Sequence, residues 1–470
     1  MIHVMAEKES PTPHVVVLPF PAHGHINPML TLSKLFSHFG LETTFAISHR
    51  FHTRLNKLTH LNKLTRLPSF HFATITDGAP SDLPKAPFQA FPLFITPTAR
   101  AAVATELRDL LAGLSPPATC VVADGLMSTI ALDVTAEFGI PVIAFRTYSA
   151  TCTWATVFLK KMVEEGVIPV QIQEDMEKEI TSIPGLENLL RGQDLPVICR
   201  LDPDHPVLNF YITETSAMCK ASSIIFNTFH NLESPIISKF STIFPKVYSL
   251  GPLHSLFKPH ITTSNNNDTT CITWLNSHHP NTVLYVSFGT VVCLSRDQVM
   301  EFWHGLVNSG KPFLWVLRDD SIQSGDGVVD SVLRHGVPAE RGLLVDWAPQ
   351  EEVLAHPAVG GFLSHSGWNS TLESISEGVP LICWPLIADQ TVNSRCVSEM
   401  WRVGIDMKGS CDRVIVENMV RDLMENKRED ILRSTAEMAN MANESVKKGG
   451  SSYRDLEKLI EDIRSMSLNN

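Results

Sequence analysis

The chain has 470 residues, of which 44% are hydrophobic and 19% are charged, and its formal net charge is −12 at pH 7. This length and composition predict a soluble globular protein with a large core and roughly two to three domains. The acidic balance argues against a surface for nucleic acid or anionic membranes. No apolar stretch is long enough to cross a bilayer, so we expect no membrane span.

The nine cysteines show neither a CxxC pair nor a Cys/His spacing typical of metal sites. This pattern predicts reduced thiols in a reducing compartment. Near the N-terminus, the polar residues 5–13 precede an apolar run that is too short for the core of a signal peptide. We therefore expect a cytoplasmic protein, and we expect it to act as a monomer.

Residues 14–20 form a continuous apolar run with the length of a buried parallel strand. In the segment that follows, Asn27 is placed to cap a helix that has Pro28 in its first turn. This interpretation puts His25 in a loop at the carboxyl end of the strand, the edge where open α/β sheets bind ligands. Most loop histidines are merely solvated, but an imidazole exchanges protons near neutral pH, so His25 is a candidate base.

Residues 119–124 predict another buried strand, which ends on the carboxylate of Asp124. The carboxyl ends of parallel strands share one edge, so we expect Asp124 near His25 although the two are far apart in the sequence. A carboxylate at the far nitrogen of an imidazole fixes its tautomer and stabilises the imidazolium. The sequence therefore predicts a His25–Asp124 pair.

A passage rich in Pro, Ser, Asn and Thr separates two similar series of strands and helices. In the second series, residues 282–288 predict a strand, and Ser295 begins a helix that ends at Gly310. Two such series predict two doubly wound α/β domains that face each other across a cleft. We place the N-terminal domain at 1–255, the linker at 256–272, the second domain at 273–450 and a C-terminal helix at 451–470.

The stretch 347–390 contains a strand that runs into the start of a helix. GGFLSH predicts the strand, Ser366 and Gly367 predict a tight turn, and Ser370-Thr371-Leu372-Glu373 matches a capping box for a helix that opens at Asn369-Ser370. The N–H groups of a helix's first turn have no partner within the helix and lie at the positive end of its dipole. We therefore expect a phosphate to bind at this helix N-terminus.

The same stretch resembles the signature box of plant UDP-dependent glycosyltransferases that act on small molecules, from its opening Trp to its closing Asp-Gln pair. The departures are small: the box commonly reads HCGWNS where this chain has HSGWNS, and Phe is commoner at the position of Ile387. PFPAHGHINPM, ADGLM and VSFGT also occur in the family's order. The resemblance implies the GT-B fold, with two Rossmann-like domains, and UDP-glucose as co-substrate.

The resemblance also implies a role for each residue of the donor site. Trp347 would stack on uracil, Gln350 would contact the nucleoside, and Glu373 would accept hydrogen bonds from both ribose hydroxyls. The residues expected at the diphosphate are Ser287, His365, Asn369 and Ser370, and those expected at the sugar are Trp368, Asp389 and Gln390.

We expect neither a metal nor a cofactor, because preorganised donors at the helix start near Asn369 would stabilise the departing diphosphate. Asp202-Pro203-Asp204 formally matches the DxD pattern that holds a metal–diphosphate in other glycosyltransferases. It lies in a Pro-rich loop and does not follow an apolar strand, so a turn is the better interpretation.

The acceptor pocket is expected in the N-terminal domain, and the residues assigned to it are Phe88, Phe91, Arg146, Tyr148 and Trp154. Aromatic side chains predict a largely apolar acceptor. Arg146 directly follows the predicted strand 141–145, where its guanidinium could pair with an acidic acceptor through two parallel hydrogen bonds. The alternative is that Arg146 pairs internally with an Asp or Glu and braces the domain.

The favoured function is an inverting transfer of glucose from UDP-α-D-glucose to a hydroxyl or carboxyl group, which gives a β-glucoside. The acceptor would be a small lipophilic plant metabolite of the terpenoid, iridoid, phenolic or flavonoid class. In the resembling family, a terminal Gln, as at Gln390, goes with glucose. Two alternatives on the same fold stay open: a UDP-sugar epimerase or hydrolase, and a non-catalytic UDP-sugar-binding protein.

Overall fold

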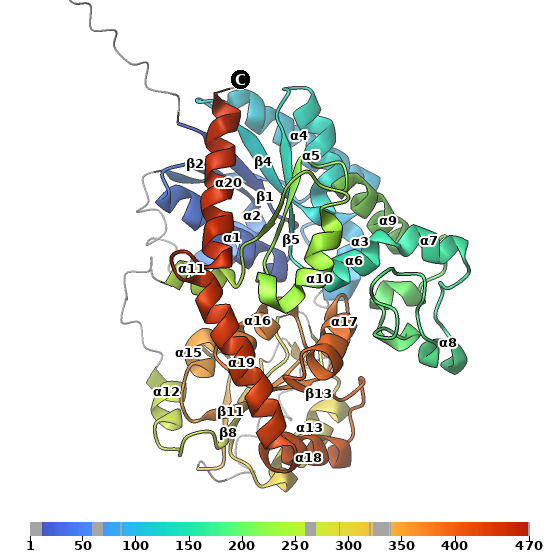
Figure 1. Cartoon of the computed structure of the whole chain (residues 1–470), viewed down its shortest axis with the longest axis vertical. Coiled ribbons are helices and arrows are strands. Elements are labelled where there is room, and N and C mark those ends of the chain that lie inside the picture. The colour runs from blue at the N-terminus through green and yellow to red at the C-terminus, as the bar shows by residue number, and fades with distance from the viewer. Residues whose placement is uncertain are drawn as a thin grey trace, which may run out of the picture.

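The computed structural model describes residues 12–58, 69–84, 87–258, 269–290, 292–318, 321–322, 338 and 340–468. Within these ranges the chain forms two α/β domains, which lie one above the other in Figure 1. Each domain is built on one sheet of parallel strands with helices on both faces, because the apolar strands must be covered on both sides. The predicted pair of doubly wound domains is confirmed.

The N-terminal sheet has seven parallel strands in the order β3-β2-β1-β4-β5-β6-β7. Strand β1, which lies inside the sheet between β2 and β4, is buried along its whole length, as the apolar run at 14–20 predicts. Strand β4 ends at Asp124 and strand β5 ends at Arg146, so both side chains reach the carboxyl edge of the sheet. The strands are β1 (His14–Leu18), β2 (Glu42–Ser48), β3 (Phe70–Ile75), β4 (Cys120–Asp124), β5 (Val142–Arg146), β6 (Ser223–Phe226) and β7 (Val247–Ser249).

The second sheet has six parallel strands in the order β10-β9-β8-β11-β12-β13. Strands β8 and β11 form its central pair, and Ser287 at the end of β8 lies beside Ser364 at the end of β11. The strands are β8 (Val283–Ser287), β9 (Phe313–Val316), β10 (Gly342–Val345), β11 (Val359–Ser364), β12 (Leu381–Cys383) and β13 (Gly404–Asp406).

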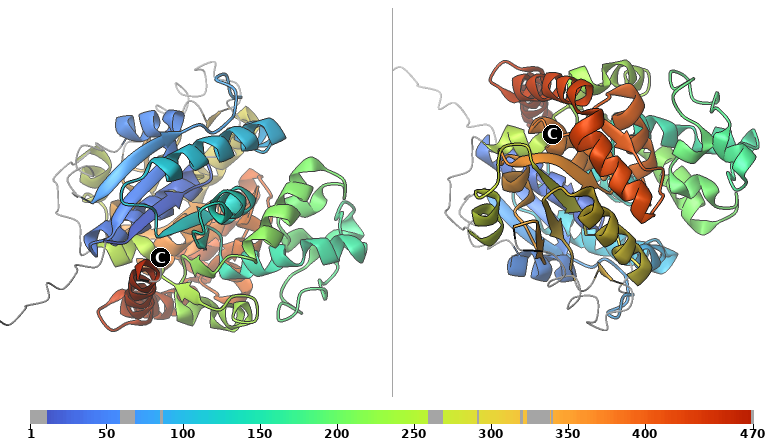
Figure 2. Two further views of the ribbon diagram at one scale, coloured as in Figure 1. Left: turned by 90° about the horizontal axis from the view of Figure 1, so that it is seen from above. Right: turned by 90° about the horizontal axis from the view of Figure 1, so that it is seen from below.

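Helices cover both faces of the N-terminal sheet. Helices α4, α5 and α9 pack on one face, and α1, α11 and α20 pack on the other. Helices α7 and α8 project to one side of the molecule (Figures 1 and 2). The helices of this half are α1 (His23–His38), α2 (His49–Leu58), α3 (Pro87–Phe94), α4 (Pro97–Gly113), α5 (Ser128–Ala136), α6 (Ala150–Val157), α7 (Leu159–Glu164), α8 (Gln173–Glu177), α9 (Pro206–Met218), α10 (His230–Phe240) and α11 (Leu253–Phe257).

The second domain contains helices α12 to α19, and the final helix α20 returns to the first domain, as Figure 1 shows. Leu456, Leu459 and Ile463 of α20 are buried in the core that faces β1. Asp455 of α20 accepts a hydrogen bond from the backbone N–H of Ser249 at 2.8 Å. The helices are α12 (Thr269–Leu275), α13 (Arg296–Ser309), α15 (Gln350–Leu354), α16 (Trp368–Ser376), α17 (Gln390–Arg395), α18 (Arg413–Arg421), α19 (Arg428–Val446) and α20 (Ser451–Ser467).

The predicted linker differs from the structure at its two ends. Residues 256–257 belong to α11 and residues 269–272 belong to α12, so both ends of the segment assigned to 256–272 are helical. Residues 259–268 lie outside the described residues.

Helix α1 begins earlier than the sequence predicts. It starts at His23 after Ala22, no side chain caps it, and Pro28 lies inside the helix instead of at its first position. The prediction that places His25 in a loop is therefore wrong. A proline has no N–H to donate to the carbonyl four residues earlier, so Pro28 leaves the Gly24 carbonyl without its helical partner. A side chain of the second domain satisfies that carbonyl, as the candidate active site shows.

Helix α16 also begins earlier, at Trp368, with Gly367 as its N-cap residue and no side-chain cap. The predicted capping box from Ser370 to Glu373 is therefore wrong, because both side chains bond to Gln350 of α15. The predicted tight turn is present, and Ser366 has a left-handed backbone with φ of 62°. Gly378 also has a left-handed backbone, with φ of 71°, just past the end of the helix, as predicted.

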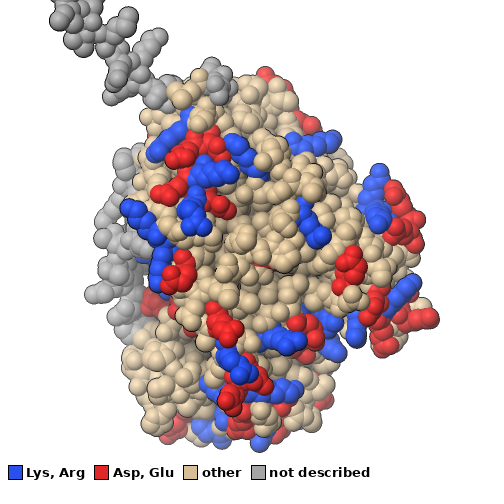
Figure 3. Space-filling model, in the orientation of Figure 1, with Lys and Arg blue, Asp and Glu red and all other residues tan. Residues whose placement is uncertain are grey.

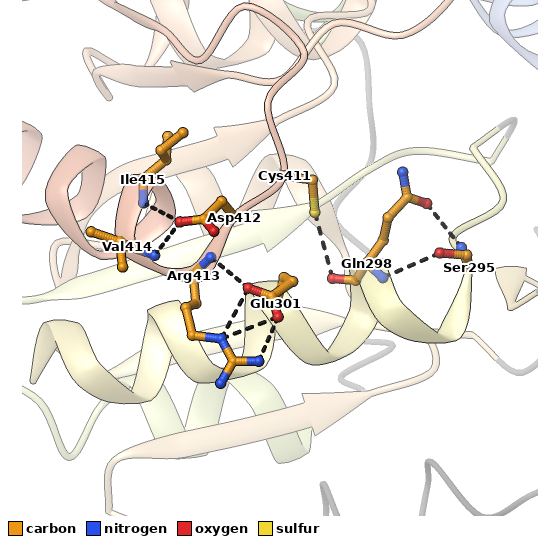
Figure 4. A network of polar contacts seen from close by, with 8 residues as sticks. All are labelled: Ser295, Gln298, Glu301, Cys411, Asp412, Arg413, Val414 and Ile415. Atoms are coloured by element: carbon orange, nitrogen blue, oxygen red, sulfur yellow. Dashed lines mark hydrogen bonds and ion pairs between the residues drawn. The ribbon is translucent and has the colours of Figure 1, made fainter.

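Helix α13 matches its prediction closely. Ser295 and Gln298 form a reciprocal capping box, and Gly310 ends the helix with a left-handed backbone. Figure 4 shows this cap together with the ion pair between Glu301 of α13 and Arg413 of α18. The pair fixes α18 against α13 at the outer face of the second domain.

The exterior is mixed in charge. Acidic and basic side chains lie next to one another on the face that Figure 3 shows. None of the helices in the described ranges is long and apolar enough to cross a membrane. All nine cysteines fall within those ranges, and none of them forms a disulfide.

Candidate active site

The two sheets bring their ligand-binding edges to the boundary between the domains. In an open parallel sheet this edge is most accessible where the strand order reverses, which here is between β1 and β4 and between β8 and β11. Two side chains that follow β11 donate hydrogen bonds across the boundary to backbone carbonyls of the N-terminal domain. The Asn369 amide donates to the Gly24 carbonyl at 3.0 Å, and the Trp368 indole N–H donates to the Asn227 carbonyl at 2.7 Å.

The structure brings the predicted His25 and Asp124 together. His25 Nδ1 lies 2.7 Å from Asp124 Oδ2 and 3.0 Å from Thr147 Oγ1. The buried Asp124 also accepts the Leu126 N–H at 2.9 Å, at the start of the 3-10 turn Gly125–Met127. Because a carboxylate only accepts, Nδ1 carries the proton and Nε2 keeps a lone pair. Within the described part of the chain, Nε2 makes no hydrogen bond.

Two aromatic rings border His25. The Phe20 ring is 5.5 Å from the imidazole centroid, and the Tyr148 ring meets it edge-on at 5.7 Å. Phe20 and Ile26 also line a pocket at the carboxyl ends of β1, β2 and β3, and most of the residues that line it are apolar. Phe20 thus contacts the imidazole and also forms part of an apolar wall next to it.

A second, smaller pocket is lined by residues of both domains. Its lining includes Tyr148, Thr156 and Tyr211 from the N-terminal domain and Asp389 from the second domain. The hydroxyl groups of Tyr148 and Tyr211 are 3.1 Å apart. Burial raises the pKa of Tyr211 to about 12, so its hydroxyl keeps its proton. This pocket therefore offers hydrogen-bond donors beside an otherwise apolar wall.

Arg146 is buried below this second pocket, with 1% of its surface exposed. Its guanidinium lies 4.5 Å from the centroid of the Tyr148 ring, and one nitrogen donates to Thr156 Oγ1 at 3.4 Å. Its Nε has no hydrogen-bond partner. No ion pair joins Arg146 to an Asp or Glu in the described ranges, so the alternative of an internal salt bridge is wrong for these residues.

The residues predicted for the nucleoside lie together, except that Trp347 remains at the surface. Trp347 is 54% exposed. The Gln350 amide donates to Ser370 Oγ at 2.9 Å and to Glu373 Oε2 at 2.6 Å, while Tyr285 donates to Gln350 Oε1 at 3.2 Å. Burial, and then the nearby Glu351 carboxylate, raise the pKa of Glu373 to about 8. The Glu373 carboxyl therefore carries its proton near pH 7 in the unliganded protein.

His365 follows strand β11 and lies against the glycine backbones of the two turns beside it. A Cβ atom added at Gly289 or Gly367 would come within 2.6 or 2.5 Å of the imidazole, so only glycine fits at these positions. Burial lowers the pKa of His365 to about 4, which keeps the ring neutral near pH 7. Ser287, at the end of the neighbouring strand β8, is 7% exposed. A neutral ring can donate a hydrogen bond without adding a charge.

The three residues predicted for the sugar differ in how they are held. The Trp368 indole is buried, donates to the Asn227 carbonyl and packs with its centroid 5.9 Å from that of the Trp401 ring. The indole is therefore occupied, and only the backbone N–H of Trp368, in the first turn of α16, could bind a sugar. The Gln390 oxygen accepts the N–H groups of Leu386 and Ile387 at 2.9 Å each, which leaves its amide nitrogen for a ligand. Burial raises the pKa of Asp389 to about 6.

Trp154 and Phe91 line neither of the two pockets. The Trp154 side chain is largely enclosed by its neighbours. Its ring packs against Phe158 and Phe240, and its N–H donates to the Pro184 carbonyl at 2.9 Å. Cys152 and Thr156 line the second pocket from the other face of the same helix. Phe91 stacks on Tyr211 with 5.9 Å between ring centroids. The side chain of Phe88 lies outside the described residues.

Sequence reasoning missed several residues at this site. Thr147 contacts His25, Tyr211 comes from a helix that received no assignment, and Asn393 holds Asp389. Thr147 follows strand β5 directly, so the argument that assigned Arg146 to the site, its place at the carboxyl end of this strand, applies equally to Thr147. Tyr211 and Asn393 lie within helices, where no motif distinguishes a pocket residue from a core residue.

Comparisons with known proteins place the chain in a family. A family model described as "UDP-glucoronosyl and UDP-glucosyl transferase" matches residues 109–438, and a glycosyltransferase N-terminal domain model matches residues 13–186. The 7-deoxyloganetic acid glucosyltransferase of Catharanthus roseus is 43% identical, over 97% of this chain and 98% of the relative. The (R)-mandelonitrile beta-glucosyltransferase of Prunus dulcis is 38% identical, over 98% of each chain.

The chain belongs to the UDP-glucuronosyl and UDP-glucosyl transferase family. Solved structures of plant members have the same fold. Medicago truncatula UGT71G1 complexed with UDP-glucose superposes with a TM-score of 0.80 at 26% identity, covering 98% of this chain and all of that one. Phytolacca americana UGT2, complexed with UDP-2fluoro-glucose and pterostilbene, gives a TM-score of 0.78 at 26% identity, covering 96% of this chain and all of that one.

This UDP-glucosyltransferase therefore has the GT-B fold, and its candidate site lies between the two domains. In the part of the transferase that the structure describes, no group of three or more His, Cys, Asp or Glu side chains is arranged to hold a metal ion. The Asp202-Pro203-Asp204 segment forms a turn before α9, and Asp202 accepts a hydrogen bond from Gln171 at 3.1 Å.

Proposed function

We propose that the transferase moves glucose from UDP-α-D-glucose to a small lipophilic plant metabolite, with His25 as the catalytic base. The observation that carries this proposal is the His25–Asp124 hydrogen bond of 2.7 Å, next to the ring of Phe20, which also lines a mostly apolar pocket. Asp124 accepts the Nδ1 proton, so the lone pair on Nε2 is available to an acceptor hydroxyl. The bond to Asp124 also stabilises the imidazolium that forms.

The proposed reaction is a single displacement. As Nε2 takes the hydroxyl proton, the acceptor oxygen bonds to C1 of glucose and the bond from C1 to the UDP oxygen breaks. UDP leaves with the electron pair of that bond, and the configuration at C1 inverts from α to β. Donors in the first turn of α16, together with the neutral His365, would stabilise the negative charge on the leaving diphosphate. No metal and no cofactor enters this reaction.

The donor roles follow from how each residue is held. Gln350, Ser370 and Glu373 form one hydrogen-bonded cluster, and we assign it to the nucleoside together with the exposed Trp347. Ser287, His365 and Asn369 are assigned to the diphosphate. The carboxylate of Asp389, the amide nitrogen of Gln390 and the backbone N–H of Trp368 are assigned to the sugar hydroxyls.

We infer a terpenoid, iridoid or phenolic acceptor. The mostly apolar lining of the pocket that contains Phe20 and Ile26 favours a lipophilic molecule. The Catharanthus roseus relative is a 7-deoxyloganetic acid glucosyltransferase, and a Gardenia jasminoides relative that is 39% identical is a 7-deoxyloganetin glucosyltransferase. Iridoids are therefore the first acceptors to test. We also propose that the enzyme is cytoplasmic and acts as a monomer.

Arg146 gives a reason to include acidic acceptors. It is a buried cation without an ion-pair partner in the described residues, and it lies behind Tyr148 and Thr156, which line the second pocket. We propose that an acceptor carboxylate in that pocket is favoured by the charge of Arg146 and by the hydroxyl donors in front of it. Phe91 and Tyr148 would form the aromatic part of the acceptor site.

The experiment incubates the enzyme with UDP-glucose and a panel of iridoid, flavonoid and simple phenolic acceptors, each with and without a carboxyl group. Mass spectrometry should show a β-glucoside with one added hexose, and the activity should persist in excess EDTA. Release of free glucose or of a different UDP-sugar, without any glucoside from the panel, would favour the hydrolase or epimerase alternative. Complete loss of activity in EDTA would point to a metal.

A further inference from the structure

Asn393 is a buried residue of α17 that joins three parts of the candidate site. Its amide nitrogen donates to Asp389 Oδ2 at 2.7 Å and to the Ser366 carbonyl at 3.0 Å. Its amide oxygen accepts from the Ser149 hydroxyl at 3.0 Å. The side chain is fully buried, with an exposed fraction of 0%. Such a residue is fixed by its partners and cannot move without breaking several hydrogen bonds.

The partners determine which way the amide faces. A carboxylate and a backbone carbonyl only accept hydrogen bonds, so the nitrogen of Asn393 must face Asp389 and Ser366. The Ser149 oxygen already accepts the N–H of Cys152 at 3.1 Å, as the N-cap of α6. Its hydroxyl proton is thereby left for the oxygen of Asn393. The amide has one satisfied orientation, and that orientation presents a donor to Asp389.

The bond between Ser149 and Asn393 crosses the domain boundary. Ser149 precedes helix α6 of the N-terminal domain, whereas Asn393 lies on α17 of the second domain. The Ser149 hydroxyl can therefore hold the Asn393 amide only while the two domains are in contact. A change in the distance between the domains would release the residue that holds Asp389.

The third partner supports the turn that leads into α16. Ser366 has a left-handed backbone with φ of 62°, which is unfavourable for a residue with a side chain. Its carbonyl accepts from Asn393, and it lies two residues before the first residue of α16. Through this bond Asn393 also braces the helix start that is assigned to the diphosphate.

We propose that Asn393 is a positioning residue that aims the Asp389 carboxylate at the donor sugar, and that Ser149 makes this alignment depend on contact between the two domains. The inference rests on the proposed function, because it takes Asp389 as a sugar ligand. According to this proposal, contact between the two domains helps to bind the donor sugar, in addition to bringing the acceptor close to the donor.

The pH dependence of the reaction gives a signature that a merely structural role would lack. Burial raises the pKa of Asp389 to about 6, and the Asn393 hydrogen bond is the largest influence that lowers it. A backbone N–H at Asp389, and then the charges of His25 of α1 and Arg146 of β5, also favour the ionised form of this carboxyl. Tyr148 and Tyr211 line the same pocket. Without the amide, the carboxyl would bind its proton more tightly and ionise only at higher pH.

The test compares the substitutions Asn393→Leu and Ser149→Ala with the wild type. Both should raise KM for UDP-glucose and lower kcat/KM, by at least about tenfold for Asn393→Leu. The affinity for UDP, which has no sugar, should change less than about twofold in Ser149→Ala, because that substitution leaves the bond from Asn393 to Ser366 in place. The acid limb of the pH profile of kcat/KM should move to higher pH in Asn393→Leu. Ser149→Thr, which keeps a hydroxyl, should restore the wild-type KM.

Thr391→Val is the matched control. Thr391 lies on the same helix, and its hydroxyl donates across the domain boundary to the Leu195 carbonyl at 2.8 Å, without contact to Asp389. The valine removes a boundary hydrogen bond of the same kind and keeps the shape of the side chain. It should leave KM for UDP-glucose and the pH profile unchanged. If Thr391→Val reproduces the effects of Ser149→Ala, any boundary contact matters equally and the proposal is wrong.

Asp389→Asn separates this inference from the proposed function. If Asp389→Asn raises KM for UDP-glucose but Ser149→Ala and Asn393→Leu do not, the positioning role is overturned while the sugar role of Asp389 stands. If Asp389→Asn has no effect, the sugar role fails and the inference fails with it. Should Asn393→Leu not fold, as judged by UDP binding, Ser149→Ala alone decides: an unchanged KM for UDP-glucose overturns the proposal.

Discussion

The Glu373 carboxyl should make donor binding depend on pH. Burial and the neighbouring Glu351 raise the pKa of Glu373 to about 8, so the carboxyl of the unliganded enzyme carries its proton at pH 7. The ribose diol donates two hydrogen bonds, which the ionised carboxylate accepts best, so binding of UDP-glucose should expel that proton. Because the pKa falls on binding, affinity should rise with pH until it levels off above about 8.

The magnitude follows from the raised pKa. A carboxyl with a pKa of about 8 is roughly 90% protonated at pH 7, so binding should release about 0.9 proton there, if the bound carboxyl is fully ionised. The dissociation constant should then be roughly tenfold lower at pH 9 than at pH 7. The Asp389 carboxyl, with a pKa of about 6, is already largely ionised over this interval and adds little to the slope.

Isothermal calorimetry of UDP-glucose binding in two buffers with different ionisation enthalpies measures the proton release directly. Glu373→Gln should abolish both the release and the pH slope. Glu377→Gln removes the neighbouring carboxylate that pairs with Lys258 at 2.6 Å, and it should keep both. A wild-type enzyme that releases no proton at pH 7 would refute the assignment of Glu373 to the ribose.

Three further predictions concern the base, the donor and the acceptor. Asp124→Asn should lower kcat by a factor on the order of 10² without weakening UDP binding, because an amide cannot stabilise the imidazolium; an unchanged rate would make Asp124 structural. UDP-glucose should be used faster than UDP-galactose or UDP-glucuronate at equal concentrations, and an equal or reversed preference would contradict the roles of Gln390 and Trp368. Arg146→Leu should weaken binding of carboxylated acceptors alone, whereas a lower melting temperature with every acceptor affected alike would show that Arg146 only braces the domain.

The sequence predicts the strands and their ligand-binding edge because these depend on local signals. The apolar runs at 14–20 and 119–124 contain the buried strands β1 and β4, and His25, after the first strand, meets Asp124, at the end of the second, as expected. Topology explains this success: parallel strands place their carboxyl ends at one edge, whatever their distance in the sequence. The ends of β8 and β11 meet for the same reason, since these two strands are neighbours.

The failures come from contacts that no local pattern contains. Pro28 predicts the first position of a helix, yet α1 starts at His23, because Asn369 of the other domain satisfies the carbonyl that the proline leaves unbonded. Helix α6, which carries Trp154, is buried on every face from Ala150 to Thr156, so hydrophobic periodicity does not show which of its residues face the pocket. Asn393 has three partners from three separate segments, and only the folded chain brings them together.

Replacement of the imidazole tests the central claim most directly. His25→Ala should lower kcat with UDP-glucose and the best acceptor by a factor on the order of 10² to 10⁴, while the dissociation constant for UDP stays within about twofold of the wild type. His23→Ala, in the same helical turn and packed on Phe51 at 5.5 Å, is the matched control and should leave kcat unchanged. Near-normal turnover in His25→Ala, with normal UDP binding, would contradict the account.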